Sequence, residues 1–383
     1  MALKPLLDFF TSLRLTVVCL TFATVLVFMG TIAQVEMGIY AAQAKYFRSL
    51  FVFWDVPGTS LRIPVYPGGY LLGGLLMINL SCSFVRRVGF KRSKLGVLFI
   101  HIGLILLLLG QLATDLLSVE SNMRLSEGES RNYSEDSRHS ELVIVDTTDP
   151  SEDAVVAIPD SVLAHQREIA NPALPFTIRV LHYWRNSTNI PPAIVSGPSL
   201  ATQGLGAGPR FRFAQAPLEP RMDRRNVPTA YVELIAPSGS LGTWMATGWI
   251  DDLQSFTHSN RTYAVGMRLA RYYKPFSLQL AKFSHDKYMG TEIPKNFSSR
   301  VRVLRPETGE DREVLIYMNN PLRYGGETFY QSGYDERDPR VTILQVVRNP
   351  GWLTPYLGCV FVGLGLSIQF TTHLLGFVKR RTP

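Results

Sequence analysis

One histidine lies inside a long apolar stretch of this chain, where few ionisable side chains are tolerated. The stretch runs from Leu95 to about Leu117, and His101 lies six residues inside it. About 20 apolar residues rising 1.5 Å each cross the roughly 30 Å hydrocarbon core of a bilayer, so we expect a membrane-spanning helix. An imidazole roughly 9 Å inside such a helix is costly unless it has a partner. His101 is therefore either a ligand or proton carrier, or a histidine hydrogen-bonded to a neighbouring helix.

Two further polar side chains are expected near the depth of His101. His373 precedes Lys379 by six residues in the last apolar stretch, and Asn79 precedes Arg86 by seven residues in the second. If these basic residues mark one membrane surface, all three polar side chains lie roughly 9–10 Å from it. They can then hydrogen-bond one another or hold a ligand, and two neutral imidazoles at one level suit axial ligation of a haem iron. The alternative for His373 is that its ring only reaches the inner interface.

The whole chain reads as a membrane protein with one large water-soluble part. We expect a membrane domain over residues 1–117, a β-rich domain over 118–350, and a fourth span with a basic tail over 351–383. The first three spans are predicted at about 15–33, 66–85 and 95–117, with an amphipathic helix on the outer membrane surface at about 35–53. A docking helix for the soluble domain is the alternative for residues 35–53. The fold class is thus four transmembrane helices with a β-rich extracytoplasmic domain inserted between the third and the fourth.

Basic residues predict the orientation of these spans. They gather in the connection between the second and third spans, and again after the fourth: Arg86, Arg87, Lys91, Arg92, Lys94, Lys379, Arg380 and Arg381. The positive-inside rule makes these segments and both termini cytoplasmic, and it puts residues 118–350 on the periplasmic or extracytoplasmic side. The formal net charge of +8 then reflects topology rather than a nucleic-acid surface, so no nucleic-acid partner is expected.

The soluble part shows eight short alternating or β-branched runs separated by turn residues. They are found at 141–146, 176–184, 229–236, 261–269, 298–304, 312–319, 327–334 and 340–347. This pattern is typical of an antiparallel β-sandwich or open barrel. Residues 190–228 are rich in Pro, Gly and Ala, and we expect a long loop or insertion there.

Most catalytic motifs are absent. The sequence has no phosphate-binding loop, no G-x-S-x-G, no H-E-x-x-H and no C-x-x-C-H. The histidines of the soluble part are scattered singly, without metal-ligand spacing, so structural or surface roles are expected for them: His139, His165, His182, His258 and His285. The three cysteines, Cys19, Cys82 and Cys359, fall in apolar segments, and no disulfide is expected in the soluble part.

Several strings, in order, carry a family resemblance. The membrane part contains SLRLT, GTIAQ, INLSCSFVRR and KRSKLGVLFIHIGLILLLLG, and the soluble part contains KPFSLQLAKFSHDKYMGTEIPKNFSS, MNNPLRYGGETFYQSGYD and RNPGWLTPYLG. In these the chain resembles the ResB (CcsB) family of System II cytochrome c biogenesis. The resemblance covers all four spans and the second half of the soluble domain. Residues 190–228 show no match.

The resemblance implies a function. Such proteins pair with a ResC (CcsA)-type membrane subunit and move haem b from the cytoplasmic to the outer side of a cytoplasmic or thylakoid membrane. There the haem is joined to the reduced cysteines of apocytochrome c, which implies thiol-reducing, thioredoxin-like partners. The family's third-span histidine, implicated in holding haem, matches His101. A second histidine usually comes from the partner, so the roles of His373 and Asn79 rest on depth alone.

The resemblance also limits what this chain does by itself. The tryptophan-rich segment and flanking histidines that mark the partner are lacking, so we expect the attachment chemistry to lie on the other subunit and this chain not to be an enzyme alone. Its β-rich domain could present an edge strand to unfolded apocytochrome. The alternative function is a non-enzymatic assembly scaffold for a respiratory or photosynthetic complex, with His101 structural. A membrane sensor is disfavoured, because the short cytoplasmic segments leave no room for an output domain.

Overall fold

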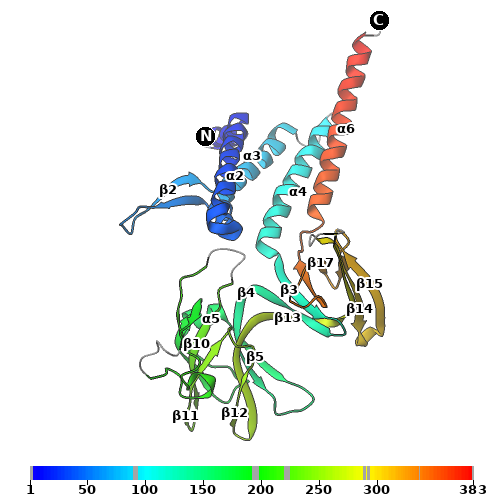
Figure 1. Ribbon diagram of the computed structural model, residues 1–383. Helices are drawn as coiled ribbons and strands as arrows, with labels where there is room; N and C mark the ends of the chain where they lie inside the picture. The colour runs from blue at the N-terminus through cyan, green and yellow to red at the C-terminus, as the bar shows by residue number, and fades with distance from the viewer. Residues whose placement is uncertain are drawn as a thin grey trace. The chain divides into compact units, whose positions relative to one another are not determined.

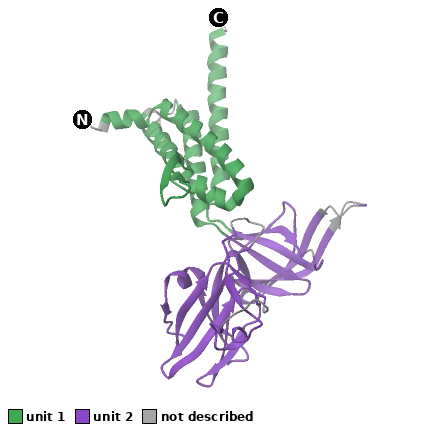
Figure 2. Cartoon of the chain, turned by 60° about the vertical axis from the view of Figure 1, so that its left-hand side comes forward, with its two compact units in different colours: residues 1–119, 220–223, 348–383 green, residues 120–219, 224–347 purple. Residues whose placement is uncertain are grey.

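The chain forms two compact units in a computed structural model. The structure describes residues 3–88, 94–191, 198–219, 225–287, 290, 294–335 and 337–381. Unit 1 comprises residues 1–119, 220–223 and 348–383, and unit 2 comprises residues 120–219 and 224–347 (Figure 2). In chain order the strands of unit 2 follow the third long apolar helix of unit 1 and precede the fourth.

Unit 1 is mainly helical. Four of its helical segments are long and apolar enough to cross a membrane, namely Leu13–Phe47, Gly69–Arg86, Leu95–Leu117 and Thr354–Arg381. The elements within it are α1 (Leu3–Phe10), α2 (Leu13–Ala42), the π-helix η1 (Gln43–Phe47), β1 (Phe51–Asp55), β2 (Arg62–Pro67), α3 (Gly69–Ser83), the π-helix η2 (Phe84–Val88), α4 (Leu95–Leu117) and α6 (Thr354–Arg381). The four apolar helices overlap the four predicted spans, and together with the β-rich unit they support a membrane protein. Lys91 and Arg92 of the predicted basic connection lie outside the described residues.

The chain turns back on itself at Gly38. This glycine has φ 79° and ψ 160°, a backbone conformation that interrupts α2 and that side-chain-bearing residues rarely adopt. The segment that follows returns along α2, because a Cβ on Gly30 would lie 2.7 Å from the ring of Phe47. Farther on, the Tyr66 hydroxyl donates to the carbonyl oxygen of Phe22 at 3.1 Å.

This reversal corrects the prediction for residues 35–53. Instead of one amphipathic helix on the outer surface, the segment contains the end of α2, the turn at Gly38, η1 and the first residues of β1. The apolar residues that suggested one helix do pack against their neighbours, but the turn at Gly38 changes the direction of the chain between them. Phe47, for example, packs against the small core of Leu26, Val52 and Leu72. Helical spacing alone did not reveal the glycine as a reversal point.

α4 and α6 pack closely and antiparallel through glycines. The α4 glycines are spaced by seven residues, which keeps Gly96, Gly103 and Gly110 on one face of the helix. A Cβ on Gly103 would lie 2.7 Å from the carbonyl oxygen of Gly358, and one on Gly96 would lie 2.9 Å from the amide nitrogen of Gln369. Small residues allow such backbone approach between membrane helices. α6 therefore extends well past the start of α4, as Figure 1 shows.

Unit 2 is built from antiparallel strands. Its strands are β3 (Val119–Ser126), β4 (Ser130–Asp146), β5 (Ala154–Pro159), β6 (Glu168–Ile169), β7 (Thr177–Trp184), β8 (Ser187–Asn189), β9 (Phe213–Gln215), β10 (Thr229–Ala236), β11 (Gly239–Thr247), β12 (Gln254–His258), β13 (Arg261–Lys287), β14 (Pro294–Arg305), β15 (Glu310–Tyr317), β16 (Leu322–Tyr324), β17 (Glu327–Tyr334) and β18 (Val341–Arg348), with one short helix, α5 (Asp160–His165). All eight predicted runs fall on these strands. The β-rich character of the domain is therefore confirmed.

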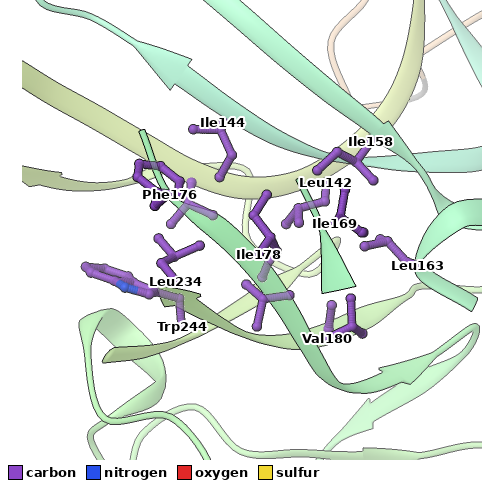
Figure 3. Packing of buried hydrophobic residues seen from close by; sticks show 14 of the residues in the cluster. Leu142, Ile144, Ile158, Leu163, Ile169, Phe176, Ile178, Val180, Leu234 and Trp244 are labelled. Atoms are coloured by element: carbon purple, nitrogen blue, oxygen red, sulfur yellow. The ribbon is translucent and has the colours of Figure 1, made fainter. Parts of the chain in front are cut away.

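Two hydrophobic cores divide unit 2 into two lobes. One core joins β4, β5, β7, β10 and β11 with the first half of β13, and Figure 3 shows its packing around Leu142, Ile178 and Leu234. The other joins β3 and β14–β18 with the second half of β13. The 27-residue strand β13 thus contributes to both cores. Its pairing with β4 loses register after Leu269 and again after Tyr273, so the strands are irregular between the two lobes.

Part of the 190–228 insertion packs onto the sheet of the first lobe. Ala201 and Phe213 are buried with Tyr231 and Met245 in a small separate core. Residues 192–197 and 220–224 of this segment lie outside the described residues. The described part of the predicted long loop therefore acts as a cover for β10 and β11.

Candidate functional site

His101 lies on α4 with its ring half-buried and its tautomer defined. Its Nδ1 lies 2.8 Å from the carbonyl oxygen of Val97, one turn earlier on the same helix. A carbonyl oxygen only accepts hydrogen bonds, so Nδ1 carries the proton of the neutral ring. Nε2 then keeps its lone pair, which is the arrangement that a second hydrogen bond imposes on a metal-ligating histidine.

The imidazole points away from the α4–α6 interface. At about 100° per residue, His101 lies roughly 160° around the helix from Gly103, which faces α6. On the opposite side of α4 its ring contacts the ring of Phe84, the first residue of η2, with centroids 6.3 Å apart and planes inclined by 36°. The ring of His101 is thus directed toward α3 and η2 rather than toward α6.

Asn79 is buried and its hydrogen bonds are used elsewhere. Its Nδ2 donates to the carbonyl oxygens of Phe10 at 2.7 Å and Ser12 at 3.1 Å, and its Oδ1 accepts from the Thr16 hydroxyl at 2.7 Å. Both amide protons are therefore occupied at the junction of α1 and α2. Asn79 is a buried polar residue within the helices of unit 1, and its hydrogen bonds attach α3 to the junction of α1 and α2.

His373 does not lie at the level of His101. Gly96 of α4 faces Gln369 of α6, so His373 lies beyond the start of α4 while His101 lies in the opposite direction from Gly96. His101 lies five residues from Gly96 and His373 lies four residues from Gln369, which separates the two histidines by roughly 14 Å along the helix axis. Two axial ligands bind one iron from opposite faces of a haem, so both imidazoles must reach the same iron. The equal depth predicted from Lys379 was wrong, because α6 extends past α4 and its basic end does not mark the same level.

The surroundings of His373 agree with this separation. The residue is exposed, and its Nε2 lies 2.7 Å from Nε2 of Gln369 on the same helix. Within unit 1, then, His373 and His101 are not brought together. The described residues contain no cluster of three or more His, Cys, Asp or Glu side chains that could hold a metal ion.

One polar cluster in unit 1 was not predicted. The Asp115 carboxylate near the end of α4 accepts a hydrogen bond from the Tyr70 hydroxyl, and its Oδ1 lies 2.6 Å from Nε of Arg48. This cluster ties α4 to α3 and to the segment that returns along α2. The available signal was an aspartate in the last turns of a predicted span, which is as unusual as His101.

The histidines of unit 2 have local, mostly structural contacts. His139 bonds Asp136, His165 contacts the carbonyl oxygen of Ser161, and His182 lies beside Trp184. The ring of His258 is edge-on to Phe176, and that of His285 stacks on Phe297 and lies close to Tyr334. Their placement on separate strands and loops agrees with the structural and surface roles that we expected.

The described part of the chain therefore holds one oriented imidazole on a helix long enough to cross a membrane. The donor set fits one axial position of a haem iron, since Nε2 of His101 has its lone pair and no hydrogen-bond partner among the described residues. A second ligand at the same level is not supplied by His373 or Asn79.

Comparison with known proteins agrees with the resemblance seen in the sequence. The model of the ResB-like family matches residues 235–342, which lie in unit 2 and run from the end of β10 into β18. Protein NrfI of Wolinella succinogenes is 29% identical over 320 residues, covering 82% of this chain and 32% of NrfI. The chain thus spans about a third of the length of this relative.

Proposed function

From the relationship of this chain to the ResB-like family, we propose that it is a membrane subunit of System II cytochrome c biogenesis. In this proposal a ResC (CcsA)-type partner and this chain together carry haem b across the membrane. The haem is then presented with apocytochrome c for covalent attachment. Haem is thus a transported substrate of the pair.

The single observation that carries the haem proposal is the state of His101. A hydrogen bond to Val97 holds the proton on Nδ1 and leaves Nε2 able to coordinate iron. The ring lies on a helix long enough to span a bilayer, so an apolar planar ligand can reach it from within the membrane. A histidine that served only to tie helices together would direct both nitrogens to protein groups.

The second axial ligand is proposed to come from the partner. His373 is separated from His101 by roughly 14 Å along the helix axis, and the hydrogen bonds of Asn79 are made with α1, α2 and the residues between them. His101 faces away from α6, so a partner helix can approach it without displacing the α4–α6 contact. The haem site is then completed only when the two subunits assemble.

The remaining parts of the proposal concern location and chemistry. Both termini are proposed to be cytoplasmic and unit 2 to lie on the periplasmic side, because the basic residues lie at one end of the predicted spans. Thioether formation is proposed to take place mainly on the partner, with the apocytochrome cysteines kept reduced by thioredoxin-like proteins. This chain would contribute the haem ligand and the large outer domain.

Visible spectroscopy of the purified chain tests the proposal. Wild type, His101→Ala and His373→Ala would each be purified alone and with a ResC-type partner. We expect a six-coordinate b-type spectrum in the wild-type pair, unchanged in His373→Ala and reduced roughly tenfold or more in His101→Ala, since coordination is lost. His373→Ala is the matched control, because it removes an imidazole from the same bundle at another level.

The same spectra distinguish the proposed function from the alternative one. A scaffold for a respiratory or photosynthetic complex, with His101 structural, predicts no histidine-dependent haem in either preparation. A six-coordinate spectrum of the chain alone that disappears in His373→Ala would contradict the helix register described above. Haem that persists in His101→Ala would remove this residue from the pathway.

A further inference from the structure

Phe84 occupies a special place beside His101. It is the first residue of η2, a five-residue π-helical turn that continues α3. Single π-helical turns are rare and are found frequently at functional sites, because they shift side chains relative to an α-helix. Here the shift places the ring of Phe84 against the ring of His101, with centroids 6.3 Å apart.

The opposite side of the α3–η2 segment is held firmly. Asn79, five residues before Phe84 and therefore roughly 140° around the helix, bonds the backbone of Phe10 and Ser12. Arg86 forms an ion pair with Asp8 of α1. These contacts at the α1–α2 junction prevent α3 from rotating, and consequently they hold Phe84 toward α4.

We propose that Phe84 is the positioning residue for the His101 imidazole, an inference that rests on the proposed function. The hydrogen bond to Val97 holds Nδ1 of His101, and the Phe84 ring limits rotation of the imidazole about the Cβ–Cγ bond. The orientation of the ring determines the plane in which Nε2 presents its lone pair. Phe84 thereby fixes how the haem is held, although it does not itself coordinate the iron.

Phe99 provides a matched control on α4. It lies two residues before His101 and pairs with Phe361 of α6, with ring centroids 5.8 Å apart. Phe99→Ala removes the same side chain from the same bundle, but on the α6 side. Phe84→Tyr serves as the conservative variant, because it keeps an aromatic ring at the contact.

The experiment compares these variants in two states. With haem bound to the chain and its partner, electron paramagnetic resonance of the low-spin ferric form reports the orientation of the axial imidazole. We expect altered g-values and haem binding weakened on the order of tenfold in Phe84→Ala, near-normal values in Phe84→Tyr, and unchanged g-values in Phe99→Ala. Without haem, we expect faster modification of His101 by diethylpyrocarbonate in Phe84→Ala only, measured by peptide mass spectrometry.

The outcomes distinguish this inference from the function on which it rests. If wild type binds no haem through His101, the proposed function fails and the inference fails with it. If wild type binds haem and Phe84→Ala has the g-values and the His101 reactivity of wild type or of Phe99→Ala, only the inference is overturned. Loss of haem in Phe84→Ala with unchanged His101 reactivity in the haem-free protein would also overturn it, because the effect would then not act through the imidazole.

Discussion

At the scale of single residues, Asp136 is a buried carboxylate of unit 2 whose pKa is lowered by its hydrogen bonds. This carboxylate is buried where the pairing of β4 and β13 loses register. Burial by itself raises the pKa of Asp136, but hydrogen bonds outweigh it and the net pKa is lowered. They come from the backbone N–H groups of His139 and Arg138, at 2.9 and 2.7 Å, and from the His139 ring and the Tyr272 hydroxyl.

The sign of the pH dependence follows from this lowered pKa. The stabilisation is fully present above the unfolded-state pKa of about 3.9 and is lost as pH falls through the lower folded-state value. At pH 7 we expect Asp136→Asn to lower the free energy of unfolding by roughly 1–3 kcal/mol, so that the variant unfolds at a lower urea concentration. Between pH 5 and pH 3 we expect the variant to lose less stability than wild type. Tryptophan fluorescence in urea titrations measures both, and an acid response equal to that of wild type would contradict the role of Asp136.

From the sequence, His101 and Asn79 were identified as unusual membrane residues, but Asp115 was missed and the sequence did not show what each residue does. His101 was identified because an imidazole inside a membrane span is costly, and this argument needs only the position of the residue within the span. Its tautomer depends on a contact with Val97, and the use of Asn79 depends on α1. The prediction that His373 lies at the depth of His101 was wrong, because the sequence of either helix alone does not show how far each helix extends beyond their contact.

At the scale of elements, the glycines Gly96, Gly103 and Gly110 of α4 fix its register against α6, on which the proposed haem site depends. Gly103 lies against Gly358 and Val362 of α6, and a Cβ there would be 2.7 Å from the Gly358 carbonyl oxygen. We expect Gly103→Val to force the helices apart and to lower the thermal midpoint of the detergent-solubilised protein, at a cost of about 1–3 kcal/mol or more. The midpoint can be followed by circular dichroism.

Gly363→Val on α6 is the control for that substitution. No atom lies within 4 Å of a Cβ placed on Gly363, so the added side chain meets open space. We expect a midpoint close to that of wild type. Equal losses in the two variants would indicate a general effect of valine in these helices rather than the close contact of α4 and α6.

Prediction of strands from the sequence does not show which strands lie at the edges of the sheets. The eight predicted runs are strands, yet their neighbours are set by pairing between distant segments, which local pattern does not encode. An open edge for apocytochrome was hypothesised, but Thr202 donates its backbone N–H to Thr243 on the edge strand β11 at 2.9 Å. The edge strand β15 carries consecutive charges from Glu310 to Glu313, which discourage strand addition. Neither of these edges favours the hypothesis.

At the scale of the whole molecule, local composition predicted the two parts of the chain, while the distribution of charge predicted only their orientation. The four spans and the large β-rich part were recognised from hydropathy and strand pattern, because both depend on local composition. The two lobes of unit 2 were not predicted, since only residues 261–269 of the shared strand β13 were recognised as a strand. Orientation in the membrane depends on Lys and Arg counts and stays a proposal.

Cysteine labelling in right-side-out vesicles tests this orientation. The native Cys19, Cys82 and Cys359 would first be replaced by serine, and a single cysteine would then be introduced at exposed Asp153 of unit 2 or at exposed Lys4 of α1. We expect a membrane-impermeant maleimide to label Asp153→Cys in intact vesicles and Lys4→Cys only after lysis, because the positive-inside rule makes the basic ends cytoplasmic.

The reverse labelling pattern would overturn more than the orientation. Unit 2 would then face the cytoplasm, and a β-rich domain on that side could not meet an apocytochrome whose haem is attached outside. His101 would lie nearer the outer surface, since it is only six residues from the start of α4. A haem ligand there could receive haem only after it had crossed most of the bilayer. The labelling result therefore decides whether His101 acts at the beginning of the proposed path or at its end.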